Sequence, residues 1–427
     1  MRTSLENDFA RDNCRPSRAA VRPGHVEGAR FIWAHDAATA VLRSRTIARI
    51  ENTLAADMQL ADVVVAVPVH NELERIERCV LALSGQMLAT FRTKLLFLVN
   101  DCTDGTAHWL FSRLEKLPVA AEVIQVTLPR AQRSAGRARW LANHAAIDRL
   151  EPLGGMLFMT DADSCVPMDW IQRYGCLLQQ GWDAVAGSVD INREDCDQIV
   201  PSLEQRNHLE CSYTTLIDEL ESLVDPVEHD PWPRHFNASG ANLAAKLTAI
   251  RQLEDFPSMA CGEDRAFVHA MEALDMWVRH DTLTTVHTSG RLFGRAEGGM
   301  ADTLRYRTHV PDSQCDERLE PADQALLRAS LRATWRQLHL RRKPEREVIE
   351  RFASDVGLSL AVVASAAGLE TFGASWHALE AASPYLVRQP IAPSRLNLEI
   401  RRATDLVHAV RRGVTPTWSA PNLELSA

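Results

Sequence analysis

Two carboxylates, Asp161 and Asp163, directly follow an apolar run at residues 155–160 that is typical of a buried strand. Two carboxylates one residue apart at a strand's end suit a divalent cation. Mn²⁺ and Mg²⁺ prefer oxygen ligands, and Mg²⁺ commonly binds one or two carboxylates together with substrate phosphates. The pair therefore predicts a metal-assisted diphosphate site, whereas an isolated Asp-x-Asp also fits a solvated turn.

Other polar side chains follow other predicted strands. His70 and Glu72 come after the β-branched run 62–69, and Asp101 comes after the apolar run 95–99. In parallel α/β sheets, ligands bind in the crevice beyond the carboxyl ends of the strands. The sequence therefore predicts that these side chains gather with the Asp-Ala-Asp motif at one edge of a sheet.

Strands and helices alternate through the middle of the chain, which predicts a doubly wound, mostly parallel α/β sheet. The predicted strands cover residues 62–69, 95–99, 122–126, 156–160, 182–191 and 237–245, and the predicted helices include residues 72–83, 136–150 and 202–224.

Three parts of the chain are distinguished by pattern. Residues 1–60 form a polar tail with a helix predicted at 37–58, residues 61–315 carry the α/β pattern, and residues 316–427 are predominantly helical. The longest apolar stretch, residues 358–369, is too short to span a bilayer and predicts a buried helix.

Composition excludes several classes of protein. The net charge of -9 over 427 residues, with no strongly basic region, argues against a nucleic-acid partner. The nine cysteines lack metal-ligand spacing and predict free thiols in a reducing compartment. The first 30 residues lack the apolar core of a signal peptide. Together these features predict a cytoplasmic protein with no transmembrane segment.

The ordered set of motifs resembles the nucleotide-sugar glycosyltransferases of family 2, which have the A-type glycosyltransferase fold. The resemblance covers residues 62–299 and implies a catalytic domain at 61–315 with a helical C-terminal extension. It also implies a Mn²⁺ or Mg²⁺ cofactor, a UDP- or GDP-sugar donor with UDP favoured, and a hydroxyl acceptor. The motifs that carry it are residues 67–72 (VPVHNE), 99–106 (VNDCTDGT), 161–163 (DAD), 239–245 (SGANLAA) and 262–264 (GED).

The same resemblance assigns donor-binding positions. A carboxylate at Asp101 would accept a hydrogen bond from the nucleobase imide. Within the basic segment 130–139, Arg137 best matches the family's basic position. For Arg130 and Arg139, a solvated face fits as well as a contact with the nucleotide. The implied donor site comprises Pro68, Val69, His70, Glu72, Asp101, Arg137, Asp161, Ala162, Gly240, Ala241, Asn242, Arg291 and Arg295.

Metal and catalytic roles follow from the resemblance as well. Asp163 would bind the metal directly, and Asp161 would face the ribose or a metal-bound water. His287 would be a third ligand, as on a late strand of some A-type transferases, or a structural histidine. Asp264 would be the general base of an inverting transfer, with Glu263 as the alternative.

Three other interpretations remain open on the sequence. A retaining transferase similar to glucosyl- or mannosyl-phosphoglycerate synthases also uses an Asp-x-Asp motif and a late histidine, so His287 supports it. A sugar-phosphate nucleotidyltransferase normally has a Gly-rich basic loop after its first strand, which residues 67–72 lack. A non-catalytic binding module would not need a base and two metal carboxylates together.

Overall fold

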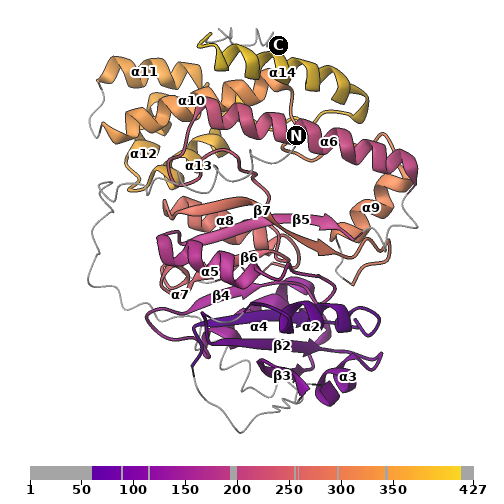
Figure 1. The fold of residues 1–427 in the computed structure, drawn as a ribbon. Coiled ribbons are helices and arrows are strands. Elements are labelled where there is room, and N and C mark those ends of the chain that lie inside the picture. Colours follow the sequence, from indigo (N-terminus) through magenta and orange to yellow (C-terminus); the bar gives the residue numbers. More distant parts are fainter. Residues whose placement is uncertain are drawn as a thin grey trace, which may run out of the picture.

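The structure is a computed structural model that describes residues 60–87, 90–113, 116–192, 200–253, 256–257, 259–295, 298–341 and 345–414. In these residues a seven-stranded, mostly parallel sheet is flanked by helices (Figure 1). The strand order is β3-β2-β1-β4-β6-β5-β7, and β6 runs antiparallel to both of its neighbours. The strands are β1 Val63–Val69, β2 Thr93–Asn100, β3 Ala120–Val126, β4 Met156–Met159, β5 Ala184–Ile191, β6 Leu243–Lys246 and β7 Val278–Thr288.

The central strands are buried on both faces, which explains their continuous apolar sequences. Alternate residues of β1 enter two separate cores: Val64 and Ala66 face one, whereas Val63 and Val65 face the other. The first core is covered by α4 (Ala135–Ile147) and α8 (Glu263–Ala273). The second is covered by α2 (Ile76–Ser84), α3 (Thr106–Arg113) and α5 (Trp170–Gln180). The predicted doubly wound α/β sheet is therefore confirmed.

The chain turns sharply where β1 and β2 end. Asn71 and Asp101 have positive φ values of 53° and 48°. Asn and Asp enter this left-handed region more readily than other non-glycine residues. The two turns are joined because Asn71 Oδ1 accepts a hydrogen bond of 2.8 Å from the Thr103 N–H. Both turns lie at the edge of the sheet where the sequence places its polar side chains.

A layer of helices lies beyond the β7 edge of the sheet (Figure 1). The helix α6 (Pro201–Val224) packs there against α10 (Ala322–Leu340) and α14 (Leu396–Arg411), so residues on both sides of position 316 build it. The remaining helices are α7 (Leu247–Ile250), α9 (Met300–His309), α11 (Arg346–Asp355), α12 (Leu360–Ala367) and α13 (Phe372–Ala382), with short 3-10 turns at Arg130–Gln132, Pro384–Leu386 and Pro393–Arg395.

Two predicted elements differ from the structure. The strand predicted at 237–245 is confined to β6, because residues 237–242 form a loop closed by a 2.9 Å hydrogen bond from Asn242 N–H to Ser239 O. The helix within 358–369 is a surface helix instead of a buried one, since only Val363 and Ala366 of α12 are buried. The helix predicted at 37–58 lies outside the described residues. Among the described helices, none has the length and apolarity needed to cross a membrane.

Candidate active site

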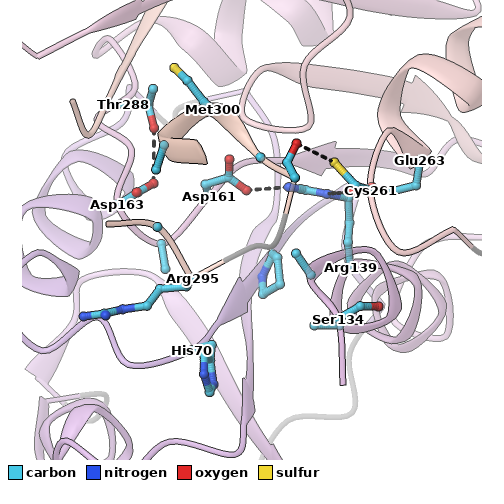
Figure 2. A pocket seen from close by; sticks show the side chains of 18 of the residues that line it. His70, Ser134, Arg139, Asp161, Asp163, Cys261, Glu263, Thr288, Arg295 and Met300 are labelled. Carbon is cyan, nitrogen blue, oxygen red and sulfur yellow. Dashed lines mark hydrogen bonds and ion pairs between the residues drawn. The ribbon is translucent and has the colours of Figure 1, made fainter. Parts of the chain in front are cut away.

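A cavity of about 690 Å³ opens at the carboxyl ends of β1, β2 and β4. Its wall brings together residues from the end of β1 to α9. Figure 2 shows Asp161, Asp163 and Glu263 among the side chains that line it. Of the predicted site residues, the lining contains Pro68, Val69, His70, Glu72, Asp101, Asp161, Ala162, Asp163, Glu263, Asp264, Arg291 and Arg295.

Asp163 is the more deeply placed carboxylate of the Asp-Ala-Asp motif. Its side chain is 13% exposed and contacts Arg291, whose Nη2 lies 3.1 Å from Oδ2, while Thr288 Oγ1 donates to Oδ1 at 3.2 Å. Burial raises the pKa of Asp163 to about 7, and the negative charges of Asp161 and Glu72 act in the same direction. The ionised carboxylate is therefore poorly compensated, and a further positive charge beside it would stabilise it.

Asp161 lies against Arg139, a residue that sequence reasoning did not select. Arg139 Nη2 donates to Asp161 Oδ1 at 2.5 Å, and Nε donates to Glu263 Oε1 at 2.9 Å (Figure 2). Burial alone would lower the pKa of Arg139, but the carboxylates of Asp161 and Glu263 outweigh it and raise the pKa above its ordinary value. Arg139 is thus a fixed cation between the two acidic motifs.

The second acidic motif lies at the start of α8, as predicted. Glu263 is held by Arg139, with 11% of its side chain exposed. Asp264 accepts a 2.8 Å hydrogen bond from the Gly240 N–H through Oδ2, and Oδ1 accepts from the Arg265 N–H. A helix start favours ionised carboxylates. The two adjacent acids therefore have different partners: a guanidinium for Glu263 and backbone amides for Asp264.

The ends of β1 and β2 form the other end of the cavity. Asp101 pairs with Arg133, whose Nη2 lies 3.0 Å from Oδ1, and its Oδ2 accepts from the Leu128 N–H at 3.3 Å. His70 Nδ1 is 2.7 Å from the carbonyl oxygen of Asn100. Of the basic segment 130–139, Arg133 is therefore the side chain that accompanies Asp101. The local basicity of the segment was the available signal, but it did not single out Arg133.

Two arginines reach the cavity from the segment between β7 and α9. Arg291 binds both oxygens of Glu72, at 2.7 and 2.6 Å, in addition to Asp163. Arg295 Nε donates to the carbonyl oxygen of Asn71 at 3.1 Å. Both predicted arginines therefore lie where they could meet a bound anion.

The charges of the cavity wall nearly cancel, with one excess negative charge if every group is ionised. The carboxylates are Glu72, Asp101, Asp161, Asp163, Glu263 and Asp264, and the guanidinium groups are Arg133, Arg139, Arg265, Arg291 and Arg295. No group of three His, Cys, Asp or Glu side chains with metal-binding geometry occurs in the described residues. Two carboxylates still fit a cation that takes its other ligands from substrate phosphates and water.

Five predicted site residues do not line the cavity. Arg137 packs its guanidinium over the Trp140 ring, 4.0 Å from the ring centroid. Gly240 and Ala241 use their backbones inside the protein, where their carbonyl oxygens accept from Arg139 and Thr160. The remaining two are Asn242 and His287.

Asn242 is fully buried, and its side-chain oxygen accepts from the Trp170 indole and the Tyr174 hydroxyl. It is therefore a packing residue of the sheet instead of a donor contact. His287 is exposed, and the neighbouring Thr288 faces Asp163 because successive side chains of a strand point to opposite faces. The structure does not bring His287 to Asp161 and Asp163, and His287 does not line the cavity.

Residues 64–230 match the family described as "Glycosyl transferase family 2". Residues 64–230 are therefore a glycosyltransferase family 2 segment, and the enzyme class that this segment supports is glycosyltransferase. The sequence has no significant match among curated proteins.

Several solved structures are similar to this chain over part of its length. TarS from S. aureus is 15% identical, with a TM-score of 0.38, and the match covers 83% of this chain but 55% of TarS. The mannosyltransferase PcManGT from Pyrobaculum calidifontis, in complex with GDP-Man and Mn²⁺, is 16% identical, with a TM-score of 0.39 and coverage of 89% and 94%. Glucosyl-3-phosphoglycerate synthase from Mycobacterium tuberculosis is 18% identical, with a TM-score of 0.35 and coverage of 60% and 82%.

Proposed function

We propose that this glycosyltransferase is metal-dependent and moves a sugar from a nucleotide-sugar donor, with UDP-sugars favoured, to an acceptor hydroxyl with inversion. The observation that supports this most strongly is the placement of Asp161, Asp163, Glu263 and Asp264 on the wall of one cavity. Arg139 lies between the two pairs and binds one acid of each. Asp161 and Asp163 would form the donor side of the cavity, and Glu263 and Asp264 would form its base side.

The donor's nucleoside would lie at the ends of β1 and β2. Asp101 is an acceptor-only group when ionised, which suits the N–H of a uracil or guanine imide. Its ion pair with Arg133 orients the carboxylate in the cavity. The diphosphate would lie towards Arg291 and Arg295, because guanidinium groups bind phosphate oxygens in a planar, two-pronged manner.

Asp163 would bind the metal directly, and Asp161 would contact it through water or contact the ribose. The poor compensation of the Asp163 charge, with Asp161 as a second carboxylate nearby, supports a cation there. A bound Mn²⁺ or Mg²⁺ supplies Lewis-acid stabilisation of the charge on the departing diphosphate. Arg291 would exchange part of its contact with Asp163 for the diphosphate.

Asp264 would be the general base. In the transfer, the acceptor oxygen forms a bond to the anomeric carbon, its proton passes to Asp264, and the bond to the diphosphate oxygen breaks with its electron pair. Glu263 is less suited to this role because Arg139 holds its carboxylate. The exclusion of His287 from the cavity wall also removes the observation that favoured a retaining enzyme.

The proposal is tested with a panel of UDP-, GDP- and dTDP-sugars in the presence of Mn²⁺. Selective binding raises the melting temperature by mass action, so the true donor is expected to stabilise the protein. The stabilising donor is then incubated with candidate hydroxyl acceptors, and NMR gives the anomeric configuration of the product. An inverted product supports the Asp264 mechanism, a retained product contradicts it, and the absence of any donor effect contradicts the proposed function.

A further inference from the structure

Arg139 joins the two acidic motifs through a single buried guanidinium. Its side chain is 10% exposed, and it donates to Asp161, to Glu263 and, through Nη1 at 2.9 Å, to the carbonyl oxygen of Gly240. Three acceptors from separate parts of the chain are thus fixed by one planar group. Because the group is shielded from water, these contacts hold their geometry more firmly than surface ion pairs do.

The Gly240 peptide extends this network to the proposed base. Its carbonyl oxygen accepts from Arg139, and the N–H of the same residue donates to Asp264 Oδ2 at 2.8 Å. A continuous path therefore runs from Asp161 through Arg139 and Gly240 to Asp264. A Cβ atom at Gly240 would lie 2.4 Å from Arg139 Cζ, so the guanidinium can occupy this place only because residue 240 is glycine.

We propose that Arg139 is a positioning residue that couples the donor side of the cavity to its base side through the Gly240 peptide. It sets the position of Asp264 relative to Asp161, and it holds Glu263 so that the two adjacent acids have different roles. This inference rests on the proposed function, because it assumes that Asp161 faces the donor and that Asp264 accepts the acceptor's proton.

Guanidinium chemistry explains why an arginine is needed. Arginine presents five donors in a rigid plane, whereas lysine presents three donors on one nitrogen that cannot reach all three acceptors in the same directions. A displacement of a catalytic group by about 1 Å can lower turnover by roughly 100-fold. Arg139→Lys is therefore expected to retain charge but lose the coupling.

The test uses Arg139→Lys, Gly240→Ala and the double variant, with Gly154→Ala as the matched control. The nearest atoms that a Cβ at Gly240 would meet all belong to the Arg139 side chain, whereas a Cβ at Gly154 meets nothing within 4 Å. Gly240→Ala therefore moves the guanidinium while every charge of the cavity is kept. It also remains informative if Arg139→Lys fails to fold.

Two measurements are made on each variant. Turnover of the donor identified above, followed as release of nucleoside diphosphate, is expected to fall roughly 100-fold in either single variant, while UDP affinity with Mn²⁺ is retained. The double variant should be no slower than the singles, because both act on the same contact. In the wild type, UDP with Mn²⁺ should slow the amide hydrogen exchange of peptides covering residues 161–163 and of peptides covering residues 262–266. In the variants, only the peptides covering residues 161–163 should exchange more slowly.

Wild-type turnover in Gly240→Ala, full additivity in the double variant, or unchanged protection of residues 262–266 would each overturn the coupling. An equal loss of UDP affinity and turnover would reduce Arg139 to a structural residue. A wild-type protein that binds no nucleotide and releases none from any donor would instead refute the proposed function, and the coupling with it. Gly154→Ala is expected to match the wild type in both measurements.

Discussion

Arg291 and Glu72 form a two-pronged ion pair, with Nη1 2.7 Å from Oε2 and Nη2 2.6 Å from Oε1. The Glu72 side chain is 5% exposed and the Arg291 side chain 15% exposed. This pair joins the end of β1 to the segment after β7, two regions that lie 219 residues apart in sequence. It therefore fixes the relative position of two walls of the cavity.

Removal of Arg291 should be costly because it leaves a buried carboxylate without its cation. Arg291→Gln is expected to lower the free energy of unfolding by about 3 to 5 kcal/mol, the usual effect of breaking a buried pair. Adding Glu72→Gln should restore part of that loss, since the uncompensated charge is then absent. Chemical denaturation of the two single variants and the double variant measures the coupling.

A surface ion pair gives the control for these Arg291 and Glu72 variants. Arg305 and Asp302 are 2.7 Å apart, with 41% and 29% of their side chains exposed. Arg305→Gln is expected to change stability by about 1 kcal/mol at most, because solvent screens such pairs. If Arg291→Gln were as mild as Arg305→Gln, or if Glu72→Gln gave no rescue, the pair would not hold the cavity walls.

Asp163→Asn should abolish the metal dependence of nucleotide binding. The wild type is expected to bind UDP at least roughly tenfold more tightly with Mn²⁺ than with EDTA, a difference of about 1.4 kcal/mol. Asn keeps the shape of Asp163 but lacks the charge that a hard cation requires. Calorimetric titration checks this, with Asp190→Asn, at an exposed carboxylate of β5 outside the cavity, as the control. Equal affinity of the wild type in Mn²⁺ and EDTA would exclude the metal site.

Asp218 on α6 predicts a pH dependence of stability. Burial raises its pKa from 3.8 to about 7, although Arg318 opposes the shift. Between these two values the folded state binds more protons than the unfolded state, so this carboxyl group lowers stability as pH rises from about 4 to 7. The loss could reach about 4 kcal/mol for a shift of this size.

Asp218→Asn should therefore gain stability relative to the wild type as the pH increases through that window. Urea denaturation at pH 4, 5.5 and 7 gives the difference, and Asp405→Asn, at an exposed position of α14, controls for the loss of one negative charge. A difference that stays constant with pH, or that changes in the opposite direction, would show that the buried carboxyl group does not titrate in this range.

Local sequence patterns predicted most of the fold and both acidic motifs. The continuous apolar runs of β1 and β2 identify strands buried on both faces, and the polar residues directly after them must lie at the carboxyl edge of the sheet. The Gly-Glu-Asp sequence at residues 262–264 likewise begins α8. Each of these features depends on residues that are neighbours in sequence, which is why no knowledge of distant contacts was needed.

Side-chain direction was harder to predict because distant contacts decide it. Arg137 and Arg139 lie two residues apart on α4, roughly 200° apart around the helix, so one can face the cavity while the other packs elsewhere. The partner of Arg139 at Glu263 lies 124 residues away. On β7, the register shifts opposite Gly187 and Ser188, and the face on which His287 emerges cannot be read from alternation alone.

Replacement of the two adjacent acids tests the central claim most directly. Asp264→Asn preserves shape and keeps an acceptor for the Gly240 N–H, but it cannot take the acceptor's proton. Glu263→Gln keeps an oxygen for Arg139 and leaves Asp264 ionisable. The measurement is the turnover of each variant with the identified donor and acceptor, beside its UDP affinity in Mn²⁺. We expect Asp264→Asn to lose roughly two to four decades of turnover with UDP affinity retained, while Glu263→Gln loses much less. Near-normal turnover of Asp264→Asn would contradict the account.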